Sequence, residues 1–220
     1  MNPYSQNKVL GTSKDSLISD IYLMDCIEGM KQYPDKYFDL CISDPPFGIN
    51  IEQRVFKDGK KWDTKTPSKE YFNEMFRVSK NQIVWGGNYF IENLYSTKCF
   101  LIWDKKITDS HTFSMAEMAW TSFDSNSKCF YQPPPGDRGF YNIDGKRIHP
   151  TQKSIDLYKW QISMFCKKGN KIIDPFLGSG SSRIAAYDLN FDFTGFELDP
   201  EYIEKSTIRF NNHINQLTLF

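Results

Sequence analysis

Long hydrophobic runs are missing from this sequence of 220 residues. No apolar stretch approaches the roughly 20 residues that a helix needs to cross a bilayer. Residues 1–20 are polar and lack the apolar segment of a secretory signal. We therefore expect neither a membrane partner nor a targeting segment.

Cysteine and histidine are scarce and scattered. The five cysteines are odd in number and form no CxxC pair, and the three histidines lie far apart. This spacing speaks against a disulfide framework and against a metal site, because both need grouped ligands. Reduced thiols are typical of a cytoplasmic protein, so we expect a cytoplasmic location and no metal.

An excess of either charge is also absent. The 27 basic and 27 acidic residues cancel, so the net charge does not indicate nucleic-acid binding. The distribution is less even, since residues 146–171 hold seven lysines and arginines against Asp156 alone. Any single lysine there is explained by a solvated surface, whereas the whole set is a candidate track for phosphates.

The order of the expected elements indicates an α/β fold. Apolar segments predict strands at 19–23, 38–43, 82–85, 99–103, 115–123, 128–132, 171–174 and 193–196. Helical periodicity predicts helices that begin at Thr66-Pro67, with Pro67 in the first helical position, and at 154–166, 181–189 and 201–213. Gly169 is the expected stop of the second of these helices. The final strand–helix–strand–helix unit predicts a Rossmann-like, mixed and mostly parallel sheet with helices on both faces.

The length fits one domain over residues 1–220. Residues 48–67 are polar, lysine-rich and without periodicity, and they are longer than an ordinary connection. We expect a mobile loop there, acting as a lid.

A glycine-rich run, Asp174-Pro-Phe-Leu-Gly-Ser-Gly180, follows one buried strand. Its glycines allow close approach of a ligand to the backbone, and the next helix offers unpaired N–H groups. Glu197 closes the following strand, where dinucleotide folds place the acid that binds ribose. Arg183 stands where a dinucleotide motif needs a third small residue, and Asp174 would repel a pyrophosphate. A ligand with ribose, an amino-acid tail and no phosphate fits better, and S-adenosylmethionine is such a ligand.

A second run, Asp44-Pro-Pro-Phe47, follows another buried strand. Its prolines fix the backbone and remove donors, so carbonyl groups and the Asp44 carboxylate remain as acceptors. Two adjacent acceptors can hold both hydrogens of an exocyclic amine, and Phe47 offers a ring on which a base can stack. An isolated run of this kind is more often a capped turn, but here it accompanies the glycine-rich run.

Together the two runs resemble the paired signatures of amino-methylating DNA methyltransferases, the N6-adenine and N4-cytosine class. The order, with DPPF first and DPFLGSG last, is similar to that of the family's beta group, which implies a circularly rearranged methyltransferase sheet. HPTQKS at 149–154 and LMDC at 23–26 resemble two further elements of the group. The resemblance implies catalysis by Asp44, Pro45, Pro46 and Phe47. It implies S-adenosylmethionine binding by Asp25, Cys26, Lys153, Asp174, Phe176, Gly178, Ser179, Gly180 and Glu197.

The implied activity is methylation of the N6 amine of adenine that is flipped out of double-stranded DNA. N4-cytosine methylation is the alternative, because cytosine members more often carry Ser in place of Asp44. A catalytically silent DNA-binding subunit is a third interpretation. Residues 86–148 would contain a short target-recognition region, so a homodimer, a restriction endonuclease partner and a restriction–modification role are left open.

Overall fold

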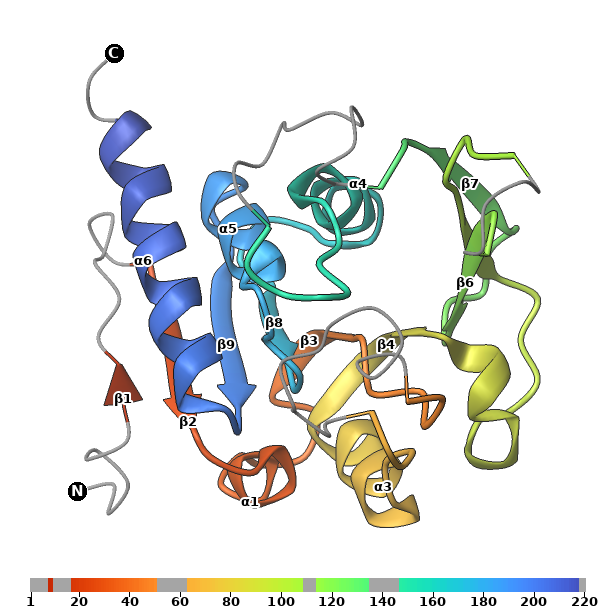
Figure 1. The fold of residues 1–220 in the computed structure, drawn as a ribbon. Coiled ribbons are helices and arrows are strands. Elements are labelled where there is room, and N and C mark those ends of the chain that lie inside the picture. The colour runs from red at the N-terminus through yellow and green to blue at the C-terminus, as the bar shows by residue number, and fades with distance from the viewer. Residues whose placement is uncertain (1–7, 10–16, 51–62, 109–113, 135–146, 218–220) are drawn as a thin grey trace.

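The computed structural model describes residues 8–9, 17–50, 63–108, 114–134 and 147–217, and Figure 1 shows how their elements are arranged. The strands are β1 (Lys8–Val9), β2 (Ser19–Leu23), β3 (Phe38–Ser43), β4 (Ser79–Trp85), β5 (Phe100–Asp104), β6 (Ala116–Thr121), β7 (Lys128–Tyr131), β8 (Lys171–Asp174) and β9 (Asp192–Glu197). The helices are α1 (Cys26–Met30), α3 (Lys69–Val78), α4 (Ile155–Phe165), α5 (Ser181–Asp188) and α6 (Pro200–Leu217), with short 3-10 turns η2 (Gly87–Tyr89) and η3 (Ile91–Asn93).

The strands form one sheet in the order β1-β2-β9-β8-β3-β4-β6-β5-β7. The central strands β2, β9, β8, β3 and β4 pair with one another in parallel. Antiparallel pairs join β1 to β2 and join β6 to both β4 and β5, while β5 and β7 are parallel. The predicted mixed, mostly parallel sheet is confirmed. The circular rearrangement and the single domain stay predictions.

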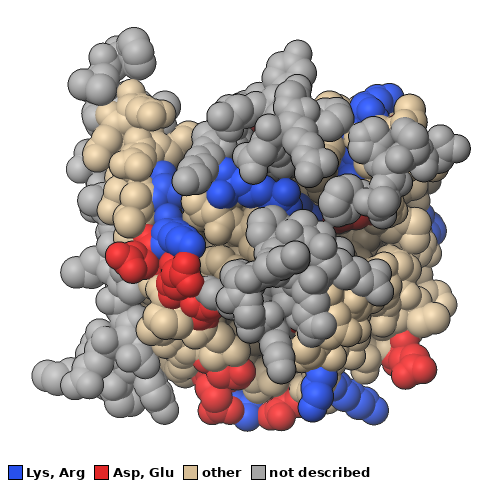
Figure 2. All heavy atoms as spheres, viewed as in Figure 1, with Lys and Arg blue, Asp and Glu red and all other residues tan. Residues whose placement is uncertain are grey.

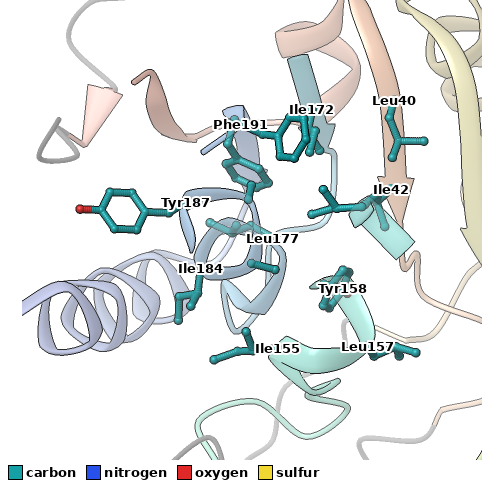
Figure 3. Packing of buried hydrophobic residues seen from close by; sticks show 14 of the residues in the cluster. Leu40, Ile42, Ile155, Leu157, Tyr158, Ile172, Leu177, Ile184, Tyr187 and Phe191 are labelled. Atoms are coloured by element: carbon teal, nitrogen blue, oxygen red, sulfur yellow. The ribbon is translucent and has the colours of Figure 1, made fainter. Parts of the chain in front are cut away.

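Helices cover both faces of this sheet. On one face, apolar side chains of α4, α5 and α6 pack against the strands in one buried cluster. Figure 3 shows part of it, with Ile155 and Leu157 of α4 at one side of the cluster and the strand residue Leu40 at the other. On the other face, α1 and α3 pack against the sheet in a second cluster. Each fully buried aliphatic or aromatic side chain contributes about 1.5–3 kcal/mol, so both helix layers are fixed by the core.

The predicted start of α3 at Thr66-Pro67 and the predicted stop of α4 at Gly169 are wrong. Helix α3 begins at Lys69, because the Ser68 hydroxyl accepts a hydrogen bond from the Tyr71 N–H at 3.4 Å and so caps the helix. Pro67 therefore precedes the cap instead of occupying the first helical position. Helix α4 ends at the cap Cys166, and Gly169, with φ +88°, lies in the turn that follows.

Arg183 is fully buried between α5, β2 and α6. Its Nε and Nη2 donate to the hydroxyl and carbonyl oxygens of Ser19, both at 3.0 Å. The guanidinium carbon lies 3.9 Å from the centre of the Phe210 ring. Burial lowers the pKa of Arg183 to about 10. A long side chain fills the space in which a dinucleotide motif needs a small residue, so the helix packs differently here.

Candidate active site

Four carboxylates stand at the carboxyl ends of four adjacent parallel strands. Asp25 follows β2, Glu197 ends β9, Asp174 ends β8 and Asp44 follows β3. These strands lie side by side in Figure 1, although the chain reaches them in a different order. With strands about 4.8 Å apart, the row extends over on the order of 15 Å. The fold thus joins the two sequence runs, residues 44–47 and 174–180, at one edge of the sheet.

The glycine-rich loop has a backbone that only glycine adopts readily. Gly178 and Gly180 have φ of +49° and +72°, in the left-handed region. The Gly178 N–H donates to Glu197 Oε2 at 2.9 Å, and the Leu177 N–H donates to the carbonyl of Phe196 at 2.9 Å. These bonds hold the loop against the end of β9.

Glu197 and Asp25 both accept backbone hydrogen bonds. Glu197 Oε1 accepts from the N–H groups of Leu198 and Asp199 at 2.8 and 3.0 Å, and burial raises the pKa of this carboxyl group. Asp25 Oδ1 accepts from the Ile27 N–H at 2.8 Å and so caps α1. No described residue forms a hydrogen bond with Asp25 Oδ2, which leaves an acceptor at the end of β2.

Asp174 has only neutral hydrogen-bond donors. Its Oδ2 accepts from the Ser182 hydroxyl at 2.5 Å and its Oδ1 from the Phe176 N–H at 2.9 Å. The side chain is buried, and that burial, aided by the charges of Asp44 and Glu197, raises its pKa to about 7. A cation placed beside it would favour the charged form.

Asp44 has a cation as its partner. Its Oδ2 lies 2.6 Å from the ammonium of Lys153, whose side chain is almost completely buried. Burial raises the pKa of Asp44, and the ammonium of Lys153 works against that rise. No described residue donates a hydrogen bond to Oδ1, so this oxygen can accept one from a substrate amine.

Phe47 packs closely on its surroundings. Its ring is stacked on Tyr89, with ring centres 4.9 Å apart and planes 12° apart, and Tyr89 is itself half-exposed. A Cβ at Gly86 would lie 2.2 Å from Phe47 Cε1, so the glycine admits the ring edge. The ring predicted to stack on a base therefore already has an aromatic neighbour on one side.

Two residues that the sequence analysis missed support the catalytic loop. Asp63 is buried, and its carboxylate accepts from the N–H groups of Gly48 and Ile49 at 2.8 and 3.3 Å. These bonds hold the beginning of the 48–67 segment against Asp63. Residues 51–62 of the expected lid lie outside the described residues. The Tyr71 hydroxyl lies 2.6 Å from Ser43 Oγ, and its ring lies 5.1 Å from that of Phe176. Tyr71 on α3 thus contacts the end of β3, directly before the DPPF turn, and the glycine-rich loop.

Lys153 joins the two loops directly. Its carbonyl accepts from the Ser181 hydroxyl at 2.7 Å, at the start of α5, while its ammonium pairs with Asp44. Arg209 Nη1 fixes the same corner by donating to Ser181 Oγ at 2.8 Å and to the Ser179 carbonyl at 2.9 Å. The sequence analysis assigned Lys153 to the cofactor alone, but its side chain lies against the carboxylate of Asp44, the residue predicted to be catalytic.

The remaining predicted residues have these positions. Pro45 is buried and Pro46 half-buried in the DPPF turn, and Ser179 is buried beside Ser181. Cys26 is buried in the second apolar cluster, where burial raises the pKa of its thiol to about 12. Its thiol is therefore neutral, with a packing role. No cluster of metal-ligating residues occurs within the described ranges.

A second pair of charged residues extends the contact at Asp44. Glu117 Oε2 lies 3.2 Å from the Lys153 ammonium, and Glu117 Oε1 lies 2.6 Å from that of Lys105. These two cations lower the pKa of Glu117 to about 2. The sequence analysis missed both residues, and the one available signal is a charged residue within the apolar strand 116–121.

The profile of the N6/N4 DNA methylase family, described as DNA methylase, matches residues 95–208, just over half of the chain. The chain belongs to this family. The DNA methylase is 24% identical to the type II methyltransferase M2.MboI of Moraxella bovis over 243 aligned positions, covering 87% of each chain.

Solved structures share the fold of this DNA methylase. A complex of M1.HpyAVI with S-adenosylmethionine superposes with a TM-score of 0.58 and 21% identity, covering 87% of this chain and 98% of the other. The cytosine-N4-specific PvuII DNA methyltransferase has a TM-score of 0.60 and 15% identity, covering 86% and 85%. These likenesses confirm the methyltransferase fold.

Basic side chains gather on one face of the DNA methylase. Figure 2 shows Lys and Arg in a band from α6 towards the segment before α4, with an acidic group beside it. In the part of the chain that the structure describes, no helix is long and apolar enough to cross a membrane.

Proposed function

We propose that this DNA methylase transfers a methyl group from S-adenosylmethionine to the N6 amine of adenine in double-stranded DNA. The observation that carries the proposal is Asp44 Oδ1 in the DPPF turn, which accepts no hydrogen bond from any described residue and lies at the same sheet edge as the glycine-rich loop. Family membership supports methyl transfer to DNA. The adenine assignment rests on Asp44 itself.

The row of carboxylates fits the proposed cofactor. Asp25, Glu197 and Asp174 present acceptors and negative charge, which suit ribose hydroxyls, an amine and a sulfonium and would repel phosphates. The ligand would contact the loop backbone at Gly178, Ser179 and Gly180. The side chains of Phe176 and Cys26 would pack under this part of the site. When bound, S-adenosylmethionine supplies an electrophilic methyl group on a positively charged sulfur.

Asp44 has the central role in the proposed chemistry. Its Oδ1 and the Pro45 carbonyl accept the two amine hydrogens, which draws the nitrogen lone pair out of the ring and toward the methyl group. The nitrogen forms its bond to the methyl group as the sulfur–methyl bond breaks, the electron pair stays on sulfur, and the amine proton leaves toward Asp44. Pro46 stiffens the turn, and Phe47 stacks on the flipped base, which offsets a flipping cost of a few kcal/mol.

Cytosine-N4 methylation is the alternative of the same class. The PvuII methyltransferase, described as cytosine-N4-specific, has the same fold, so the fold does not discriminate between the two bases. An Asp in the first position of DPPF favours adenine. A silent DNA-binding subunit fits less well, because Asp44 and the glycine loop are both intact.

The remaining parts of the proposal concern DNA and partners. The basic band in Figure 2 would contact phosphates, and part of residues 86–148 would read the target sequence. The likeness to a type II methyltransferase supports a restriction–modification role, with a restriction endonuclease as partner. We also propose that the protein is cytoplasmic and forms a homodimer.

The product base tests this proposal. The protein would be incubated with isotope-labelled S-adenosylmethionine and DNA from a methylation-deficient bacterium, and the DNA digested to nucleosides for mass spectrometry. We expect label in N6-methyladenine. Label in N4-methylcytosine would overturn the adenine assignment, and binding of cofactor without label in DNA would support a silent subunit.

A further inference from the structure

Four charged side chains, two buried and two half-buried, form a continuous chain that begins at the proposed acceptor. Asp44 pairs with Lys153 at 2.6 Å, Lys153 with Glu117 at 3.2 Å, and Glu117 with Lys105 at 2.6 Å. The exposed fraction of these side chains lies between 3% and 23%. The two positive and two negative charges cancel, which is how such groups are tolerated away from water.

We infer that Glu117 and Lys105 are positioning residues for methyl transfer, which act on Asp44 by controlling the position and charge of Lys153. This inference rests on the proposed function, because it assigns to Asp44 the role of amine acceptor. Neither residue belongs to the DPPF or the glycine-rich run.

The geometry of Lys153 supports this role. Its ammonium is shared between two carboxylates and lies closer to that of Asp44. Its backbone is fixed by the Ser181 hydroxyl, so the long side chain has a defined starting point. Removing the Glu117 charge would let the ammonium bind Asp44 more tightly and make that carboxylate a weaker acceptor. Removing the Lys105 charge would leave Glu117 to draw the ammonium away from Asp44.

The position of the pair in the fold adds a second argument. Glu117 lies on β6, and Lys105 directly follows β5, the neighbouring antiparallel strand. These strands lie outside both sequence runs, yet Glu117 reaches the carboxyl end of β3 through Lys153. A purely structural link between strands needs no charge, since apolar residues of similar volume are often as stabilising. Because the link is ionic, removing either charge should change the pKa of Asp44, and that change can be tested.

The charges that act on Asp44 come from several elements. Lys153 and Lys105 favour its ionised form and Glu117 disfavours it. Asp174, at the end of β8, and Tyr158, on α4, are also coupled electrostatically to Asp44. Glu117 and Lys105 are charged and can be changed without altering the proposed amine or cofactor contacts.

The test compares the variants Glu117→Gln and Lys105→Met. Single-turnover methylation of DNA from a methylation-deficient bacterium would be measured from about pH 5 to about pH 9, with labelled S-adenosylmethionine in excess. The rate should fall at low pH as Asp44 becomes protonated. We expect Glu117→Gln to move this acid limb to lower pH and Lys105→Met to move it to higher pH, each by on the order of half to one pH unit. At the optimum, Glu117→Gln should lower the rate about tenfold to 100-fold, with cofactor affinity unchanged.

Asp188→Asn is the matched control. Asp188 also contacts two basic side chains, Lys159 at 2.6 Å and His213 at 2.8 Å, but lies at the far end of α5. The variant Asp188→Asn should leave the acid limb of the pH profile and the methylation rate unchanged. Shifts of opposite sign in the two variants cannot arise from a shared loss of stability.

Unchanged acid limbs in both variants, or shifts in the same direction, would overturn the inference while wild-type activity upholds the proposed function. If Glu117→Gln does not fold, the Lys105→Met limb alone decides, because only a shift to higher pH agrees with the inference. A wild-type protein that methylates no DNA at any pH would overturn the proposed function instead.

Discussion

Asp174 is a buried carboxyl group and Asp44 a half-buried one, and their partners give them different properties. Asp44 faces an ammonium at 2.6 Å, whereas Asp174 accepts only from a hydroxyl and a backbone N–H. A cationic partner favours the charge that burial disfavours, and neutral donors do so less strongly. At the residue scale, Asp44 is thus suited to accepting an amine hydrogen, and Asp174 to responding to a cationic ligand.

Asp44→Asn should nearly abolish methyl transfer. The change keeps the shape of the side chain and one acceptor oxygen but removes the charge that polarises the amine. We expect kcat to fall about 10²- to 10³-fold, as for the loss of one preorganised electrostatic group. Affinity for S-adenosylmethionine, measured by calorimetry, should change less than about threefold, because in the proposal Asp44 contacts the base.

Asp39→Asn is the control for this variant. Asp39 lies near the other end of β3 and pairs with Lys80 at 2.7 Å. Its replacement should leave kcat unchanged. Normal turnover by Asp44→Asn would contradict the catalytic assignment.

Asp174→Asn should alter how stability depends on pH. The pKa of Asp174 is about 7 in the folded protein, against about 3.9 for an unfolded aspartate. A raised pKa means that the folded state binds the proton more tightly, so this group lowers the free energy of unfolding as pH rises from about 4 to about 7. Asn lacks the charge, can accept from the Phe176 N–H with its Oδ1, and can donate from its Nδ2 to the Ser182 hydroxyl oxygen. We expect the free energy of unfolding of the variant to exceed that of wild type by on the order of 1–4 kcal/mol between pH 5 and pH 8.

Urea unfolding at these two pH values measures that gain. Calorimetry should also show that Asp174→Asn binds S-adenosylmethionine more weakly at pH 8, where wild-type Asp174 is charged. Equal pH dependence of stability in both proteins would show that Asp174 does not titrate in this range.

At the scale of elements, the turn from β4 into η2 sets the position of Phe47. Gly86 has φ +67° and leaves no room for a Cβ next to the Phe47 ring. Gly86→Ala would strain the backbone by about 1–2 kcal/mol and also displace the ring. We expect the methylation rate to fall and the KM for DNA to rise, with cofactor affinity unchanged.

Gly169→Ala separates the effect of backbone strain from the effect of displacing the Phe47 ring. Gly169 has φ +88°, but nothing lies within 4 Å of the added Cβ. This variant should carry similar backbone strain, measured by urea unfolding, and methylate DNA at the wild-type rate. Equal activity of the two alanine variants would exclude a role for the Phe47 position.

Local signals predicted most elements, and they failed where long-range contacts decide. Apolar segments correctly indicated β3, β8 and β9, and the glycine run correctly indicated the loop before α5. The start of α3 was wrong because the Ser68 hydroxyl, and not Pro67, determines it. The sequence also gave no sign that β6 lies between β4 and β5, since pairing order depends on the folded sheet.

At the scale of the whole molecule, the carboxylate row and the charge chain arise only on folding. Lys153 and Asp44 are 109 residues apart, and no local pattern marks their contact. The motifs nevertheless predicted both loops, because each combines special backbone residues with a preceding buried strand. What they did not predict is that Lys153 touches both loops, and that Glu117 and Lys105 complete its surroundings.

A crystal structure of the protein with S-adenosylmethionine tests the account most directly. We expect the ligand along the carboxyl ends of β2, β9 and β8, with its ribose at Glu197 and its methyl group facing Asp44. A ligand seated elsewhere, or one whose methyl group points away from Asp44, would contradict the central claim that one pocket holds both the donor and the target amine.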